Sequence, residues 1–334
     1  MSKHTFFCID GHTCGEPVRL VAGGAPSLRG DTMSARRADF LARCDWVRTS
    51  LMYEPRGSEV MSGAILYPPT RTDCDLGVLY IEVSGCLPMC GHGTIGTVTF
   101  AVEHGLVASR DGGDVVRLDT PAGPVEAEIR RDGAHVDSVR LRVVPSYLAA
   151  ADVRIEVEGV GSLVVDVAYG GNFYAIVEPQ PGYRDIDELG RDGIQALSPR
   201  VLQAIARSVP LVHPDDPTIR GCGHVLWAAR PRSARARARN AVFYGERGID
   251  RSPCGTGTAA RMAQLAAKGE LAVGQEFINE SIIGSLFEGR VESVCVVGDR
   301  EGIIPSVAGW ARVTGLNTIF VDDRDPYAHG FVLR

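Results

Sequence analysis

Cys90-Gly91-His92-Gly93-Thr94 and Cys254-Gly255-Thr256-Gly257-Thr258 repeat one pattern, in which a cysteine is followed by glycines and threonine at matching positions. Behind each cysteine, apolar and small residues recur at the spacing of a helical face that packs on a core. These residues are Ile95, Val98, Thr99 and Val102 in the first copy, and Ala259, Met262, Ala263 and Ala266 in the second. The chain is therefore predicted to be an internal duplication, with a cysteine at the start of a helix in each half.

The predicted helices also end alike. His104-Gly105 closes the first and Lys268-Gly269 the second, and a basic-type residue followed by glycine is usual at a helix C-terminus. At the other end, the first N–H groups of a helix have no helical partner and carry partial positive charge, so they favour a thiolate. We therefore expect both cysteines to have a pKa below the free value of about 8.5 and to act as bases.

A Cys-His pair for nucleophilic catalysis is a second interpretation of the first copy, because His92 follows Cys90 closely. It is disfavoured for two reasons. Side chains so close together at a helix start are expected to diverge, and the pair would leave Cys254 without a role. If the halves of the molecule face each other, a substrate instead lies between two thiols, with its carboxylate on the amides that follow each cysteine.

Length and composition predict two domains, because 334 residues with 45% hydrophobic content can form two cores. From the duplication we place the first half-domain at 1–150 and the second at 151–315, with the last strand near 316–334 able to pack back on the first. There is no apolar run of membrane-spanning length and no signal-peptide pattern, so we expect a cytoplasmic protein that does not contact membranes.

Charge and cysteine usage exclude other classes of partner. The net charge of −6 is spread along the chain, and the arginines between 230 and 239 lack aromatic partners, so no nucleic-acid partner is expected. The nine cysteines have no regular spacing and are expected to be reduced. His12 and Cys14 could be imagined as metal ligands, but no further ligands recur at metal-site spacing. A structured turn is therefore favoured there and no metal is expected.

Elsewhere, residues 34–50 have the amphipathic pattern of a surface helix, and 180–217 is expected to hold two helices. Apolar and polar residues alternate along 125–130 and 139–143, which is typical of half-buried antiparallel strands. After the second cysteine helix, strands are expected near 276–280, 286–297 and 310–321.

Two long motifs, Met89–Gly96 and Asp250–Thr258, resemble the paired signatures of the proline racemase family. Asp10–Thr13, Glu54–Gly57 and Gly170–Tyr174 fit as well, so the resemblance spans nearly the whole chain. It implies an α/β (α+β) fold of the diaminopimelate-epimerase-like type. In that fold two similar domains each curl a largely antiparallel sheet around a central helix, and the active site lies between them.

The resemblance also implies inversion at an amino-acid α-carbon without a cofactor, acting on a small imino acid. One thiolate, from Cys90 or Cys254, removes the α-proton, and the other thiol delivers a proton to the opposite face. His92 and Asp250 are implied to bind the ring nitrogen. The carboxylate is expected to lie on backbone amides as negative charge develops. These amides belong to Gly91, His92, Gly255 and Thr256. A homodimer is left open.

The substrate is suggested by single positions. A threonine in place of Cys254 would suggest a 3-hydroxyproline dehydratase, so the cysteine favours epimerisation. Ser62 stands where proline racemases carry an aromatic ring, which suggests a hydroxylated ring and 2-epimerisation of 4-hydroxyproline. His224 is either a donor to the substrate or a buried structural residue, and the preceding 221–223 is less bulky than expected. A proline racemase, a 3-hydroxyproline enzyme and a dithiol redox or binding protein remain as alternatives.

Overall fold

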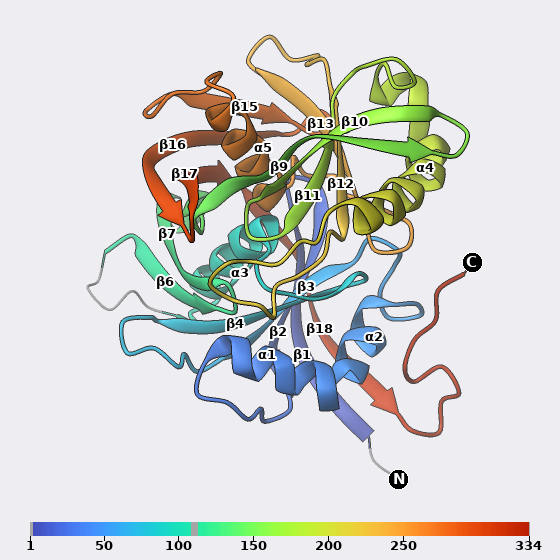
Figure 1. Cartoon of the computed structure of the whole chain (residues 1–334). Coiled ribbons are helices and arrows are strands. Elements are labelled where there is room, and N and C mark those ends of the chain that lie inside the picture. Colours follow the sequence, from blue (N-terminus) through green and yellow to red (C-terminus); the bar gives the residue numbers. More distant parts are fainter. Residues whose placement is uncertain (1–2, 108–112, 334) are drawn as a thin grey trace. The chain divides into compact units, whose positions relative to one another are not determined.

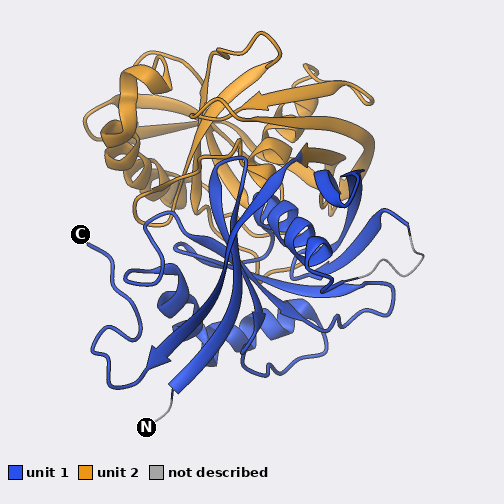
Figure 2. Ribbon diagram, turned by 180° about the vertical axis from the view of Figure 1, so that it is seen from behind, with its two compact units in different colours: residues 1–141, 309–334 blue, residues 142–308 orange. Residues whose placement is uncertain are grey.

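The computed structural model describes residues 3–107 and 113–333 and divides the chain into two compact units (Figure 2). Unit 1 consists of Met1–Leu141 and Gly309–Arg334, and unit 2 of Arg142–Ala308. The boundary that the sequence suggested, near residue 150, lies inside a strand of unit 2. No helix in the described part of the chain is both long enough and apolar enough to cross a membrane.

In its described residues, unit 1 contains three helices, and most of its strands come before residue 142 (Figure 1). Its elements are β1 (Lys3–Thr13), β2 (Glu16–Gly23), α1 (Met33–Arg43), α2 (Asp45–Met52), β3 (Ser62–Tyr67), β4 (Leu76–Glu82), β5 (Gly85–Leu87), α3 (Gly91–Glu103), β6 (Val115–Thr120), β7 (Gly123–Asp132), β8 (His135–Arg142) and β18 (Ala311–Asp322). Strand β2 is antiparallel to β1 and parallel to β3, and β4 is antiparallel to β3 and parallel to β6.

Unit 2 repeats this order of elements. They are β9 (Ser146–Val157), β10 (Gly161–Tyr169), β11 (Phe173–Val177), α4 (Ile186–Ser208), β12 (His224–Ala229), β13 (Ala238–Tyr244), β14 (Gly248–Ile249), α5 (Gly255–Ala267), β15 (Glu276–Glu280), β16 (Leu286–Val297) and β17 (Arg300–Gly309). Strand β11 is antiparallel to β10 and parallel to β12, and β13 is antiparallel to β12 and parallel to β15.

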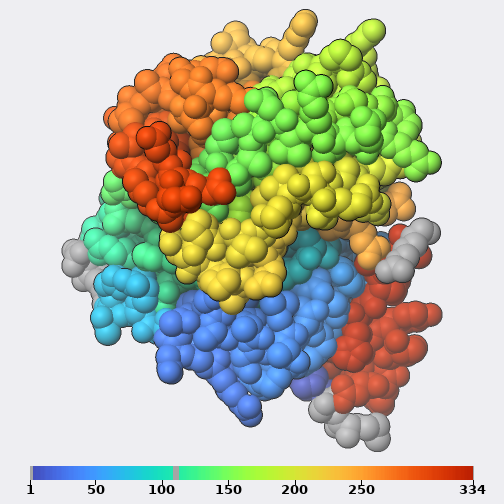
Figure 3. All heavy atoms as spheres, in the orientation of Figure 1, coloured from blue at the N-terminus to red at the C-terminus, as the bar shows by residue number. Residues whose placement is uncertain are grey.

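The pairings therefore confirm the duplication element by element. The series β1 to β4, β5, α3, β6 and β7 matches β10 to β13, β14, α5, β15 and β16. The C-terminal strand β18 is antiparallel to β1, as β9 is to β10, so the end of the chain supplies the outer strand of unit 1. In Figure 3 the red C-terminal residues adjoin the blue N-terminal ones.

Helices α3 and α5 form the centre of their units. The sequence predicted one buried face for each, but α3 is buried on all sides from Gly91 to Ala101, and in α5 only Arg261 is less than fully buried between Gly255 and Leu265. Small residues allow strands to pack closely on every side of a helix. The predicted ends are confirmed, because Gly105 and Gly269 follow the helices with φ of 66° and 74°.

Three other expectations need correction. The helix predicted over 34–50 is two helices, α1 and α2, that meet at Cys44. The N–H of Cys44 donates a hydrogen bond to the carbonyl of Phe40 at the end of α1. The polar stretch from Asp10 continues strand β1 to Thr13, so the turn is confined to two residues. Strand β17 was missed, although it pairs antiparallel with β16 over most of its length. The two helices expected in 180–217 are the two parts of α4, which kinks at Gly190.

Candidate active site

In unit 1, three of the predicted site residues lie together at the start of α3. Cys90 is the N-cap residue, with extended backbone angles, and its Sγ is 3.6 Å from Nδ1 and 3.7 Å from Nε2 of His92. The His92 Nε2 is 2.9 Å from the Oγ of Ser62, the first residue of β3. All three side chains are buried. The strand end thus fixes the imidazole ring, and the ring contacts the thiol.

This contact corrects one sequence argument. The Cys90 and His92 side chains do not diverge, because the first turn of α3 brings them against each other. However, Sγ is nearly equidistant from the two ring nitrogens. The thiol therefore lies beside the ring rather than in line with one nitrogen, which is not the geometry of a nucleophile paired with its base.

Close packing around this turn depends on glycine. A Cβ on Gly93 would lie 2.9 Å from Cys90 Sγ, and a Cβ on Gly96 would lie 3.0 Å from the Oγ1 of Thr13. The Thr13 hydroxyl donates to the carbonyl of His92 at 2.8 Å. The missing side chains thus let the thiol and the β1–β2 hairpin approach the helix.

In unit 2, Cys254 is the N-cap residue of α5, with φ of 64° and ψ of 107°. A non-glycine residue rarely adopts a positive φ, and such strain is found at functional sites. Its Sγ is 3.4 Å from the hydroxyl of Tyr174, which is 2.5 Å from the Oγ1 of Thr256. As in unit 1, a glycine follows, and a Cβ on Gly257 would lie 3.0 Å from the sulfur.

The glycine-rich motif Gly170–Tyr174 packs against this turn. A Cβ on Gly170 would lie 2.3 Å from the carbonyl oxygen of Thr256 and 2.4 Å from the backbone nitrogen of Ala260. The loop between β10 and β11 therefore presses directly on the first turns of α5, and only glycine permits that approach.

Asp250 holds the segment that leads to Cys254. Its backbone N–H donates to the carbonyl of Val242 at 2.8 Å, and its Oδ1 accepts from the N–H of Ser252 at 2.7 Å. The Ser252 hydroxyl in turn accepts from the N–H of Cys254 at 3.1 Å. Asp250 is buried, and the charge of its carboxylate acts on the nearby thiol. Its binding of a ring nitrogen stays a prediction.

The protonation of Cys254 differs from the sequence expectation. Burial raises the pKa of this thiol well above its ordinary value, and the charge of Asp250 raises it further. Hydrogen bonds from Tyr174, from the N–H of Gly257 and from Thr256 lower the pKa but do not outweigh burial. The expectation of a lowered pKa considered the helix N-terminus and left out burial and the charge of Asp250.

His224, the first residue of β12, is also buried in unit 2. Its ring packs against Tyr174 with 4.8 Å between ring centroids, and its Nδ1 has no hydrogen-bond partner among the described residues. Burial lowers the pKa of His224 to about 4, so the ring is neutral at physiological pH. Gly221 precedes it with φ of 76°, and a Cβ there or on Gly223 would meet nothing within 4 Å.

No group of three or more metal-ligating side chains occurs within residues 3–107 and 113–333. The imagined ligands near the N-terminus have other contacts. His12 Nδ1 accepts from the N–H of Gly15 at 3.2 Å, and Cys14 Sγ donates to the carbonyl of Trp310 at 3.5 Å. These contacts support the structured turn, while independence of metals and cofactors stays a prediction.

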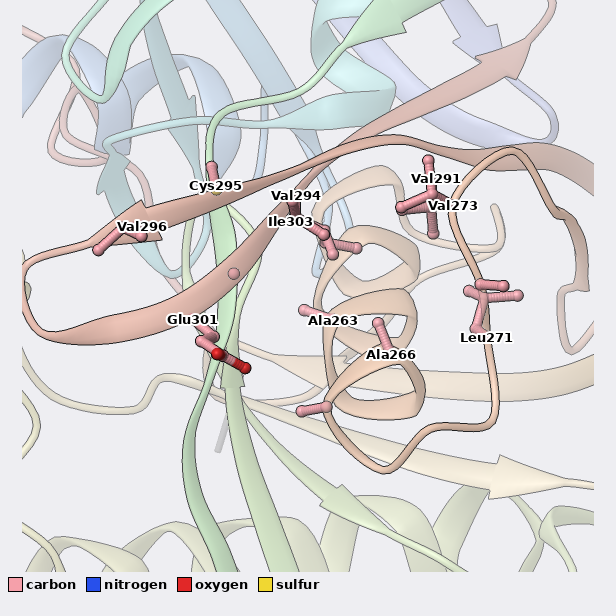
Figure 4. Close-up of a pocket in the computed structure, with 13 residues that line it drawn as sticks. Ala263, Ala266, Leu271, Val273, Val291, Val294, Cys295, Val296, Glu301 and Ile303 are labelled. Carbon is pink, nitrogen blue, oxygen red and sulfur yellow. The ribbon is translucent and has the colours of Figure 1, made fainter.

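A cavity of about 650 Å³ lies elsewhere in unit 2, and Figure 4 shows its lining from α5, β16 and β17. Its walls are mostly apolar, with Ala263 and Ala266 on the C-terminal half of α5 and Glu301 on β17. None of the site residues predicted from the sequence lines it. The chemistry-bearing residues are instead at the opposite, N-terminal end of the same helix.

Sequence reasoning missed Tyr174, Tyr80 and Thr13 as residues that contact the cysteine turns. The Tyr80 hydroxyl is 2.6 Å from the Oγ1 of Thr94, which donates to the carbonyl of Cys90 at 2.7 Å. Local spacing could not identify these contacts, because strand pairing creates them. The available signals were Thr13 and Tyr174, each of which ends a motif that resembles the family.

Comparisons with known proteins agree over the whole chain. A family model described as proline racemase matches residues 8–332. The 4-hydroxyproline 2-epimerase of Ancylobacter novellus is 60% identical over 333 residues, covering 100% of both chains. The 4-hydroxyproline epimerase of Brucella ovis is 60% identical over 331 residues, covering 99% of both.

Solved structures give the same result. A hydroxyproline epimerase from Agrobacterium vitis, with bound trans-4-hydroxy-L-proline, is 30% identical with a TM-score of 0.90, covering 99% of this chain and 95% of that one. A PhzF-family protein of Bacillus anthracis, 14% identical with a TM-score of 0.60 and covering 96% and 99%, shares the fold alone. The predicted fold class is therefore confirmed, and the chain belongs to the proline racemase family.

Proposed function

We propose that this protein is a 4-hydroxyproline 2-epimerase that interconverts trans-4-hydroxy-L-proline and cis-4-hydroxy-D-proline. The observation that carries the proposal is a buried thiol at the start of both central helices, in a chain 60% identical over its full length to 4-hydroxyproline 2-epimerases. Inversion needs one group to remove the α-proton and a second to protonate the opposite face. The duplication supplies one such group in each unit.

In the proposed reaction, the thiolate of one cysteine takes the α-proton and the bond electrons pass into the substrate carboxylate. The thiol of the other cysteine then returns a proton to the other face of the α-carbon. The N-terminal N–H groups of α3 and α5 stabilise the charge that develops on the carboxylate. Because Cys254 can donate a proton, the carbanion is reprotonated at the α-carbon, and a dehydratase outcome is not favoured.

The polar side chains near each thiol are proposed to bind the substrate. His92 is fixed by Ser62, and together they present an imidazole and a hydroxyl from unit 1. Asp250 and His224 do the same in unit 2, with one carboxylate and one neutral imidazole. A site with such groups should favour a hydroxylated ring, because unsubstituted proline would leave buried polar groups unpaired.

The test follows the configuration of the product. The protein is incubated with trans-4-hydroxy-L-proline or with L-proline, and chiral chromatography measures the D-configured product. We expect turnover of hydroxyproline to exceed that of proline by about tenfold or more in kcat/KM, the equivalent of one buried polar group left unpaired. Equal turnover of the two substrates would overturn the substrate assignment and favour a general proline racemase.

Two variants sharpen the assay. Ser62→Phe removes the partner of His92 Nε2 and adds an aromatic wall, so it should shift the preference toward proline. Ser62→Ala removes the hydroxyl without adding a wall and separates the two effects. Absence of any racemisation, together with a Cys90–Cys254 disulfide formed under mild oxidation, would instead support the dithiol alternative.

A further inference from the structure

Tyr174 lies against the catalytic thiol of unit 2 and has no role in the reaction proposed above. It is 1% exposed on β11 and packs in a cluster of buried residues that includes Leu226, Val242 and Cys254. Its hydroxyl oxygen is 3.4 Å from Cys254 Sγ and 2.5 Å from Thr256 Oγ1. The phenol therefore bridges the sulfur and a hydroxyl on the first turn of α5.

The chemistry of the three groups sets the direction of these hydrogen bonds. A phenol has one O–H to donate, and a threonine hydroxyl can both donate and accept. When Thr256 donates to the phenol oxygen, the O–H of Tyr174 is directed at Cys254 Sγ. A hydrogen bond to an ionised acceptor is roughly twice as strong as one between neutral groups. The thiolate form of Cys254 therefore favours this arrangement most.

The thiolate needs such donors because it is shielded from water. Cys254 is 5% exposed, and both burial and the charge of Asp250 oppose ionisation of its thiol. The groups that act in the opposite direction are Tyr174, the N–H of Gly257 and Thr256, whose single hydroxyl proton acts through the phenol when it is donated to the phenol oxygen. Of these, Tyr174 comes from a different element of the fold, so its position does not depend on the helix turn alone.

We propose that Tyr174 is a positioning residue whose hydroxyl donates to the Cys254 sulfur and holds the thiolate in place for proton exchange with the substrate. The inference rests on the proposed function only for the use that Cys254 makes of the proton. When the thiolate takes the α-proton, the phenol keeps its own proton and its hydrogen bond becomes a weaker one to a neutral thiol. Tyr174 thus stabilises one protonation state without transferring a proton.

Tyr174→Phe tests this proposal, because it removes the hydroxyl and keeps the ring that packs on His224. The readout is the pH dependence of alkylation at Cys254 by iodoacetamide, followed by peptide mass spectrometry. We expect the midpoint to rise by about one to two pH units, the equivalent of a hydrogen bond to a charged group. The kcat/KM for trans-4-hydroxy-L-proline at pH 7 should fall about 10- to 100-fold.

Matched variants separate positioning from structural support. Tyr80→Phe in unit 1 also removes a buried tyrosine hydroxyl paired with a threonine, and it should leave the Cys254 midpoint unchanged. Thr256→Ser keeps a hydroxyl and should retain the native midpoint. Thr256→Val should raise the midpoint, and its effect should not add to that of Tyr174→Phe, because the two groups act as one chain.

A Cys254 midpoint that is the same in Tyr174→Phe and in the native protein would overturn the proposal. So would an equal shift in Tyr80→Phe, since the effect would then be global. The alkylation readout needs no substrate. A protein that shows the shift but does not epimerise hydroxyproline would therefore defeat the proposed function and leave the role of Tyr174 standing.

Discussion

Cys90 and Cys254 begin matching helices in two units of the same topology, yet the imidazole and the hydroxyl near each thiol have exchanged places. Strand register shows the exchange. Ser62 begins β3 opposite Val18 of β2, and His224 begins β12 opposite Tyr174 of β11. These strands match in the duplication, so unit 1 has a hydroxyl where unit 2 has an imidazole.

At the start of the two helices the arrangement is reversed, with the imidazole in unit 1 and the hydroxyl in unit 2. The residue two positions after the cysteine is His92 in unit 1 and Thr256 in unit 2. In unit 1 the imidazole contacts the thiol directly, whereas in unit 2 a tyrosine hydroxyl does so. The backbone differs as well, because Cys90 has φ of −141° and Cys254 has φ of 64°. A duplicated backbone thus supplies two thiols whose chemical surroundings differ.

The largest expected effect comes from removing each thiol in turn. Cys90→Ser and Cys254→Ser should each lower epimerisation by a factor on the order of 10² to 10⁴, because a serine hydroxyl is a far weaker base than a thiolate. Deuterium incorporation at the α-carbon from D₂O, followed separately for each enantiomer, shows which half-reaction survives. We expect the two variants to retain exchange of opposite enantiomers.

The comparison of the two units fails if either variant epimerises at a nearly native rate, because only one thiol would then be needed. The difference between the two units is larger than proposed if one variant loses exchange of both enantiomers. In that case the thiols would differ in more than the face that each serves.

The next effect concerns the glycine that makes room for each sulfur. Gly93→Ala and Gly257→Ala would place a Cβ at 2.9 Å and 3.0 Å from the sulfur of Cys90 and of Cys254, so the thiol must rotate away. A displacement of about 1 Å in a reacting group can cost about 100-fold in rate, and we expect a loss of that size in kcat/KM for both variants.

Alanine is a better helix former than glycine by about 1 kcal/mol, so helix propensity gives no reason for unfolding. Gly113→Ala serves as the control, since a Cβ there would meet nothing within 4 Å. Native activity in both cysteine-turn variants would show that the position of the sulfur does not limit the reaction. A loss in only one would identify the turn with the stricter geometry.

The sequence predicted those features of the molecule that depend on local pattern. Three features could be predicted because each depends on short motifs of adjacent residues. These are the duplicated cysteine turns, the glycines after both helices and the family. The burial of α3 on every side could not be predicted, because Thr97 lies off the predicted core face and has a polar side chain, yet the fold buries it. One buried face was the natural expectation for such a helix.

Contacts that depend on strand register could not be predicted from the sequence either. Ser62 was singled out for its small hydroxyl, but its bond to His92 depends on where β3 begins beside β2. Tyr174 precedes Cys254 by a long stretch of chain, and the parallel pairing of β11 with β12 places it beside His224. Non-local pairing of this kind is set by the whole sheet rather than by any one motif.

The smallest predicted effect is on the pH dependence of stability, and it compares the imidazoles of His92 and His224. The His92 ring is hydrogen-bonded to Ser62, whereas the His224 ring is buried with Nδ1 unpaired among the described residues. Burial holds the pKa of His224 near 4, below its ordinary value of about 6.5. Between these two values the unfolded chain binds a proton at this residue and the folded chain does not. Stability from a neutral His224 is therefore present above about pH 6.5 and is lost as the pH falls toward 4.

We expect this residue alone to lower the free energy of unfolding by about 2 kcal/mol between pH 7 and pH 5. His224→Phe keeps an aromatic ring against Tyr174 and should remove that part of the pH dependence, while His135→Gln, at an exposed ring, should not. Urea unfolding at the two pH values measures the difference. A slope that His224→Phe leaves unchanged would mean that the His224 ring becomes charged within the fold, and burial would then not hold it neutral.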